Sequence, residues 1–333
     1  MTKRGNRRKR HGWIVFVLSA VVVAFFVLNS ARDKHSGLFE WAELNIPGAD
    51  VIRLLFEDGT HRYPSNTSIE SIENPGVTVH FIDVGQAKSI FVEAPGKNVL
   101  IDAGERDQGA MIIRYLVSHG IRSLDIVIGT HPHSDHIGGL AAVIGGMNVD
   151  TVILPRIPEE ITPTTATYTG LLEAVANAGL RITPARPGDV YDLGKGAELT
   201  ILGPVDHYNE LNDMSVVSRL RFGDVSFLFT GDAMKDAEED ILAAGGSVSA
   251  SVLDVGHHGS RTSTNERFLL AVNPAIAVIS CGIDNMYGHP HGDVITLLRK
   301  HGQKIYRTDT DGTVVIATDG ESLGVKTGKG GGD

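Results

Sequence analysis

The amino-acid sequence predicts a mixed α/β (α+β) domain, and three observations support that fold class. Short apolar runs rich in β-branched residues, such as 124–128 and 225–229, have the length and composition of buried strands. Segments with helical periodicity, such as 108–119, lie between such runs. The chain has 333 residues, 42% hydrophobic and 21% charged, so it is long enough to bury a sizeable core.

Charge is distributed unevenly along the chain. Residues 1–11 contain six Lys and Arg residues and no acidic residue, so they carry +6. The formal net charge of the whole chain is −10, which leaves −16 on the remainder. An acidic domain does not attract nucleic acid over its whole surface, so such a substrate would need a local basic groove or bound metals. The single cysteine, Cys281, excludes an internal disulfide and a cysteine-based metal site.

The basic segment is followed by an uncharged apolar run of 16 residues, 13–28. As a helix it would span about 24 Å, slightly less than a bilayer core of about 30 Å, and residues 29–31 can extend it. The run is at the long end for a signal-peptide core and no Ala-x-Ala site follows, so residues 1–31 are expected to be a transmembrane anchor, with a cleaved signal as the alternative. The positive-inside rule then places everything after Ala31 outside the cytoplasm, either as a single-pass membrane protein or as a secreted one.

Residues 32–75 precede the main domain. A hairpin is plausible over 51–67, and Asn74-Pro75-Gly76 marks a boundary. Three interpretations stay open for this segment: a spacer, a small added β module, or an edge of the main sheet. The main domain is predicted to cover residues 76–318, and residues 319–333 are predicted to be a flexible tail.

The main domain is expected to begin with a β-meander over 77–104. Its strands are predicted at 77–86, 89–93 and 98–104, and a helix over 108–119 leads to the buried strand 124–128.

A cluster of metal-binding side chains follows that strand. His131, His133, Asp135 and His136 fall within six residues, in the order His-x-His-x-Asp-His. Pro132 rules out a helix through the histidines, so they are expected on a loop, with a helix starting after Gly138-Gly139. Imidazole and carboxylate ligands suit zinc, and also manganese or iron.

Further strands and helices follow, and several polar side chains stand at predicted strand ends. Strands are expected at 151–154, 199–204, 225–229, 252–255, 275–280, 304–306 and 313–317, and helices at 169–178, 235–244 and 293–301. The residues of chemical interest in this part are His207, Asn212, Asp213, Asp232, His257, His258, Ser260, Arg261, His289 and His291.

Five of these segments together resemble one known family, the metallo-β-lactamase superfamily, and within it the hydrolase domain of the ComEC branch of competence proteins. The segments are Asp83-Val84-Gly85-Gln86, His131-Pro132-His133-Ser134-Asp135-His136, Thr230-Gly231-Asp232-Ala233, Gly256-His257-His258-Gly259-Ser260-Arg261 and Tyr287-Gly288-His289-Pro290-His291. The resemblance spans residues 77–318. It departs from the branch after Gln86, where Ala87-Lys88-Ser89 stands in place of the usual Gly-Asp-Ser, and in lacking the polytopic channel.

The resemblance implies a four-layer αββα sandwich with two divalent metals at one edge, zinc in the first place and manganese as the alternative. His131 and His133 would hold one metal, and Asp135, His136 and one of His257 and His258 the other. Asp232 would bridge the two, and Asp102 would brace the histidine loop rather than bind metal. The third ligand of the first metal is left open among His207, Asn212 and Asp213, or none.

The implied function is that of a membrane-anchored, metal-dependent phosphodiesterase or nuclease, with Asp135 in the catalytic centre. Ser260, Arg261 and His289 are candidates for binding a phosphate or protonating a leaving group. The alternatives are a lactone or β-lactam hydrolase on the same fold, and a binding module that has lost activity. An anionic phosphodiester and the membrane are the expected partners; no protein partner is indicated.

Overall fold

The computed structural model describes residues 66–68, 72 and 74–329. The expected anchor at 13–28, most of the hairpin expected at 51–67, and residues 330–333 lie outside that range. In the described part of the chain, no helix is long and apolar enough to cross a bilayer.

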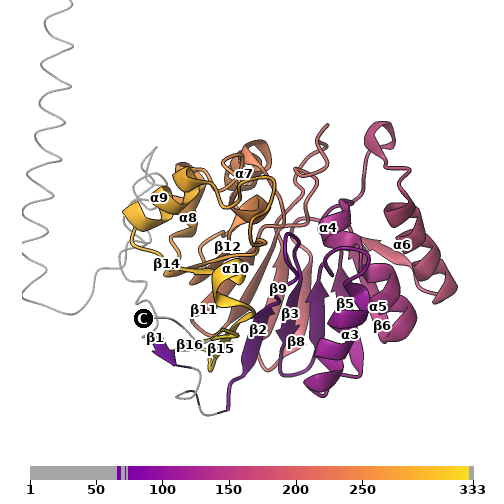
Figure 1. Cartoon of the computed structure of the whole chain (residues 1–333), viewed down its shortest axis with the longest axis horizontal. Coiled ribbons are helices and arrows are strands. Elements are labelled where there is room, and N and C mark those ends of the chain that lie inside the picture. Colours follow the sequence, from indigo (N-terminus) through magenta and orange to yellow (C-terminus); the bar gives the residue numbers. More distant parts are fainter. Residues whose placement is uncertain (1–65, 69–71, 73, 330–333) are drawn as a thin grey trace, which may run out of the picture. The chain divides into compact units, whose positions relative to one another are not determined.

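Two β-sheets form the centre of the domain (Figure 1). Within the described residues, the first has nine strands in the order β1-β16-β15-β2-β3-β4-β5-β6-β7. Their bounds are β1 Asn66–Ser68, β2 Val77–Phe81, β3 Ile90–Glu93, β4 Asn98–Ile101, β5 Ser123–Ile128, β6 Asn148–Leu154, β7 Ile182–Pro184, β15 Val314–Thr318 and β16 Leu323–Thr327. The second has seven strands in the order β14-β13-β12-β11-β10-β9-β8. Their bounds are β8 Val190–Gly194, β9 Ala197–Ile201, β10 Ser218–Phe222, β11 Val225–Phe229, β12 Val252–Asp254, β13 Ile276–Ile279 and β14 Lys304–Arg307.

Helices cover the outer face of each sheet, which gives the four layers α, β, β and α. The first sheet packs against α3 Gly109–Ser118, α5 Leu140–Gly146 and α6 Ala166–Asn177. The second packs against α7 Lys235–Ala243, α8 Glu266–Val272 and α9 Gly292–Lys300. The described residues also form short helical turns: α4 Ser134–Ile137, α10 Thr308–Asp311, and the 3₁₀ turns η2 Glu159–Ile161 and η3 Gly256–Gly259.

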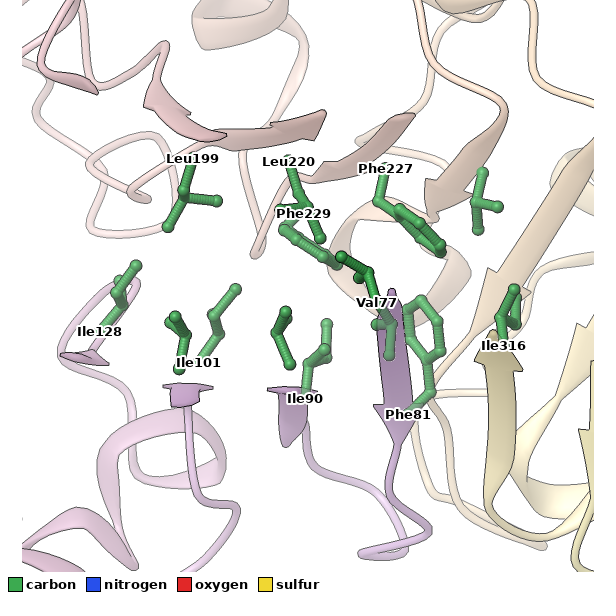
Figure 2. Packing of buried hydrophobic residues seen from close by; sticks show 14 of the residues in the cluster. Val77, Phe81, Ile90, Ile101, Ile128, Leu199, Leu220, Phe227, Phe229 and Ile316 are labelled. Carbon is green, nitrogen blue, oxygen red and sulfur yellow. The ribbon is translucent and has the colours of Figure 1, made fainter. Parts of the chain in front are cut away.

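Alternation along the strands explains why the two sheets pack face to face. In β4, Val99 and Ile101 point into the core between the sheets, whereas Leu100 points to the helices, as the two-residue period of a strand requires. Figure 2 shows side chains of the first sheet, among them Ile90 and Ile101, facing those of Leu199, Leu220 and Phe229 across the gap. Each fully buried side chain of this kind contributes about 1.5–3 kcal/mol to folding.

Because several neighbouring strands are parallel, the segments that carry the candidate site residues lie at one edge of the sheets. Strands β4, β5 and β6 are parallel in the first sheet, and β11, β12 and β13 are parallel in the second. The chain leaves the carboxyl ends of such strands on the same side, which is where α/β proteins place their ligands. The segments that follow β4, β5, β11, β12 and β13 therefore meet there.

Three expectations need correction or refinement. The flexible tail expected at 319–333 is wrong for Leu323–Thr327, which forms β16 antiparallel to β15. Asn66–Ser68 pairs with β16 as β1, so this part of residues 32–75 is an edge of the main sheet. The histidine segment is not loop throughout: Asp135 and His136 lie in α4, because a proline at position 132 blocks a helix through itself but not one that starts at Ser134.

Candidate metal centre

Four of the predicted ligands converge within a few ångströms. Asp135, His136, Asp232 and His258 each offer one ligand atom, and these atoms all lie within 4.8 Å of one another. The Nε2 atom of His258 is 3.2 Å from Asp135 Oδ2, and that of His136 is 3.2 Å from Asp232 Oδ1. The two Nε2 atoms are 3.3 Å apart. Of the two adjacent histidines, His258 is therefore the one that joins this group.

A second group adjoins the first through Asp232. The Nε2 atom of His131 lies 3.0 Å from Nδ1 of His133 and 4.0 Å from Asp232 Oδ2. The same Asp232 Oδ2 atom is 3.7 Å from His257 Nε2 and 3.6 Å from His258 Nε2. The Asp232 carboxylate thus has imidazoles on both of its oxygens, and His257 is one of those that approach Oδ2.

Asp102 braces the histidine segment, as predicted. Its Oδ2 atom accepts hydrogen bonds from His136 Nδ1 and from the Thr130 hydroxyl, both at 2.7 Å. Its Oδ1 atom accepts from the Thr130 backbone N–H at 2.8 Å. Such contacts fix the tautomer and the orientation of a ligating imidazole.

The other inner histidines are held in the same manner. His258 Nδ1 donates to the carbonyl oxygen of Ser280 at 2.8 Å, so its Nε2 atom turns to the centre. His131 Nδ1 lies 3.2 Å from the Thr130 hydroxyl and 3.3 Å from that of Ser215. Ser215 also accepts from the backbone N–H of Asp232 at 3.0 Å, so one hydroxyl positions both groups.

Backbone geometry places the remaining ligands. Gly231 has φ +55°, and a Cβ there would lie 3.0 Å from both Ser215 Oγ and Thr130 Cβ, so a glycine permits the turn that presents Asp232. His257 and His258 follow β12 with φ of 51° and 56°, both left-handed. Two consecutive non-glycine residues in that region are uncommon, and such strain is concentrated at functional sites.

The charges of the centre favour a bound cation. Burial alone would raise the pKa of Asp232, but the His136 and His258 imidazoles lower it well below its usual range. Burial would lower the pKa of His136, yet Asp232 and Asp102 raise it well above its usual range. An imidazole nitrogen must be unprotonated to bind a metal, so metal binding at this centre is expected to depend on pH.

The donor set fits divalent metals. Imidazoles whose Nδ1 atoms are already committed present Nε2 atoms towards a buried carboxylate. Among the described residues, Asp232 Oδ1 has no well-aligned hydrogen-bond donor. Nitrogen and carboxylate oxygen ligands of this kind suit zinc and manganese.

Of the three candidates for a third ligand of the first metal, only Asn212 has a described contact with a histidine of the centre. His207 is exposed. Asp213 accepts a hydrogen bond from the Met234 backbone N–H at 2.8 Å, next to the start of α7. Asn212 lies against the centre, with its Nδ2 atom 3.5 Å from His257 Nε2.

The three candidate substrate-binding residues differ in burial and in contacts. Ser260 is buried and bonds the Thr262 hydroxyl at 3.0 Å, which in turn lies 3.0 Å from His257 Nδ1, so Ser260 supports a ligand. Arg261 is exposed, and its backbone N–H donates to His291 Nδ1 at 3.1 Å. His289 is half-buried, with its ring centroid 5.7 Å from that of His257; burial and then the neighbouring imidazoles lower its pKa to about 4.

Sequence reasoning missed Lys88, which is fully buried behind the centre. Its Nζ atom donates to Asp254 Oδ2 at 2.9 Å and to the Gly231 carbonyl at 3.0 Å. Its backbone N–H donates to the Asp135 carbonyl at 3.0 Å. Lys88 therefore ties the first sheet to the ends of β11 and β12. The departure after Gln86 was the one sequence signal that pointed to this position.

Comparisons with known proteins were consistent with this geometry. A family model described as the metallo-beta-lactamase superfamily matches residues 82–283. The chain is similar to ComE operon protein 3 of Bacillus subtilis, with 33% identity over 71% of this chain and 32% of that protein. It is also similar to competence protein ComA of Neisseria gonorrhoeae, with 32% identity over 74% of this chain and 33% of that protein. The chain thus spans about a third of the length of these relatives.

Among solved structures, the chain resembles CmlA, a diiron β-hydroxylase from Streptomyces venezuelae. The TM-score is 0.50, with 14% identity over 74% of this chain and 55% of that one. At that identity the likeness concerns the fold alone.

Proposed function

The chain belongs to the metallo-β-lactamase superfamily of hydrolases, and from this premise we propose that it is a dinuclear, ComEC-like phosphodiesterase or nuclease. The observation that carries the proposal is the position of Asp232 between two sets of imidazoles, 3.2–4.0 Å from their nitrogens. A carboxylate in that position can be shared by two cations, as two-metal hydrolases require.

The ligands divide into two sets in this proposal. His131, His133 and His257 would hold the first cation. Asp135, His136 and His258 would hold the second, and Asp232 would be shared by both. Zinc is the expected metal and manganese the alternative. Divalent cations supply such a site with an activated water nucleophile and with positive charge for the anion that develops.

The protein's own residues then orient the substrate. Arg261 is exposed, follows the His257-His258 segment, and carries a guanidinium, a group that binds phosphate oxygens in bidentate fashion. His289 lies beside His257 and His258, where its ring can hydrogen-bond a substrate oxygen. Arg261 favours a phosphodiester over a neutral lactone, and similarity to competence proteins favours the same choice.

The location of the domain is also a proposal. The step from +6 in residues 1–11 to the acidic remainder supports an N-terminus inside and a catalytic domain outside the cytoplasm, with residues 13–28 as the membrane contact. Protease added to intact cells should then remove the domain. Protection until the cells are lysed would refute this orientation.

The catalytic proposal is tested with the purified chain on a panel of substrates under zinc or manganese. The panel contains single- and double-stranded DNA, RNA, bis(p-nitrophenyl) phosphate, nitrocefin and an acyl lactone. We expect phosphodiester cleavage, and we expect Arg261→Ala to reduce it while Arg267→Ala, an exposed arginine on α8, leaves it unchanged. Robust nitrocefin turnover without phosphodiester cleavage would overturn the proposal.

A further inference from the structure

An exposed apolar loop stands beside the candidate metal centre. Ile283 is 68% exposed, Met286 89% and Tyr287 61%. In the described part of the chain only seven large apolar side chains are exposed, and three of them lie within residues 283–287. Single exposed apolar residues are ordinary on protein surfaces, whereas a cluster of them is typical of a binding surface.

The loop is held in a fixed conformation. Asn285 Nδ2 donates to the carbonyl oxygens of Gly282 and His289, at 2.9 and 2.6 Å. The Asn285 side-chain oxygen accepts from the His289 backbone N–H at 2.9 Å. The apolar side chains are therefore presented by an ordered turn, so their contact with a ligand costs little conformational entropy.

Tyr287 links this loop to the centre. Its ring is stacked on that of His289, with centroids 5.6 Å apart and planes at 21°. The His289 ring is stacked in turn with His258, at 6.2 Å and 17°. Tyr287 is therefore connected through His289 to His258, one of the ligands proposed for the second metal.

A pocket of about 330 Å³ opens between Tyr287 and Asp135. Its wall includes Gln86 and Gln108, whose side chains are already bonded: Gln86 Oε1 accepts from the Gly282 N–H at 3.0 Å, and Gln108 Oε1 from the Glu105 N–H at 2.8 Å. The Glu105 carboxylate accepts from the Ser134 hydroxyl at a long 3.3 Å. The pocket thus combines an aromatic face with carboxylate acceptors, which suits a flat group that carries N–H donors.

We propose that this pocket binds an unpaired nucleobase next to the scissile phosphodiester, stacked on Tyr287 and donating an amino hydrogen to Glu105. This inference rests on the proposed phosphodiesterase function and names its substrate class. Aromatic side chains stack on bases of single strands, and carboxylates accept from the cytosine amino group. The phosphate lies toward the metals and Arg261, while the uncharged base occupies the acidic part of the site. Bases in a duplex are stacked on each other, so the pocket selects single strands.

The test compares Tyr287→Ala, Tyr287→Trp and Glu105→Gln in the full-length chain. The control is Leu270→Ala, which removes an equally exposed apolar side chain from α8. The substrates are a single-stranded oligo-dC, an oligo-dT and an abasic strand of the same length. We expect Tyr287→Ala to lower kcat/KM on oligo-dC about tenfold, within the range for loss of one base–aromatic stack. Tyr287→Trp should retain the wild-type value, and Glu105→Gln should remove a preference for oligo-dC over oligo-dT.

A binding measurement separates this inference from the proposed function. Dissociation constants for labelled oligo-dC and the abasic strand are measured in EDTA, where no cleavage occurs. A tenfold rise for oligo-dC alone in Tyr287→Ala supports the base site, even if the wild type cleaves no phosphodiester. Equal losses on both strands would show that Tyr287 acts by shaping His289, and equal binding of both strands by the wild type would equally overturn the inference while leaving phosphodiesterase activity intact.

Discussion

The histidines of the centre fall into two groups that differ in burial and support. His131, His136 and His258 are at most 2% exposed. The Nδ1 atom of each contacts an interior group: the Thr130 and Ser215 hydroxyls, the Asp102 carboxylate or the Ser280 carbonyl. His133, His257 and His289 are only partly buried, and Thr262 and Gln86 support the last two. The inner group fixes where a metal can sit, whereas the outer group borders the space that a substrate must enter.

The largest effect should come from changing Asp232, whose carboxylate lies near histidines of both groups. We expect Asp232→Ala to remove at least one of two metals per chain and to abolish turnover, because two cations would then repel each other without a carboxylate between them. Metal analysis and a phosphodiesterase assay check this. Asp224→Ala, an exposed aspartate, is the control; unchanged metal content in Asp232→Ala would contradict the assignment.

The second effect concerns the support behind the inner group. Lys88→Met leaves the Asp254 carboxylate buried without its partner, which typically costs about 3–5 kcal/mol of stability. Urea unfolding measures the loss. A double variant Lys88→Met with Asp254→Leu should recover much of it, because neither charge of the pair then remains buried without its partner. If the single and double variants are equally unstable, packing rather than charge explains the effect.

His80, a buried histidine outside the centre, should make the stability of the fold depend on pH. Burial, and then nearby His119, lowers the pKa of His80 from 6.5 to about 4. The unfolded chain therefore takes up this proton below pH 6.5 while the folded chain does not, so stability falls as pH falls from about 6.5 to about 4. His80→Gln should remove that part of the slope in unfolding measured at a series of pH values. Parallel slopes in both proteins would show that His80 titrates normally.

The smallest effects on metal affinity should distinguish the support of buried His136 by Asp102 from the support of partly exposed His257 by Thr262. Asp102→Asn weakens the brace of His136 and should reduce metal affinity or activity by about 10- to 100-fold. Thr262→Val removes the hydroxyl beside His257 and should reduce them less, because that histidine is partly exposed and can be solvated. Competition with a metal indicator measures both. A larger loss in Thr262→Val would reverse the assignment of inner and outer groups.

Local sequence patterns predicted the parts of the site that local structure builds. The histidine segment, Gly231-Asp232 and Asp102 each follow a strand whose apolar pattern is visible in the sequence. The bracing role of Asp102, the bridging role of Asp232 and the two-sheet sandwich were implied by the family resemblance. The role of Lys88 was not predictable, because Asp254 lies 166 residues away along the chain. The strand Leu323–Thr327 was not predicted because it contains only two larger apolar residues, Leu323 and Val325, between polar neighbours. Its burial depends on pairing with β15.

The buried Lys88 bears on the state of the domain without metal. Its ammonium group places a permanent counter-ion beside Gly231 and Asp254, behind the carboxylates that await metal. The charge that offsets the buried Asp254 carboxylate at this edge therefore comes from the polypeptide itself. We expect that removal of metal leaves this charge balance and the Lys88 contacts in place.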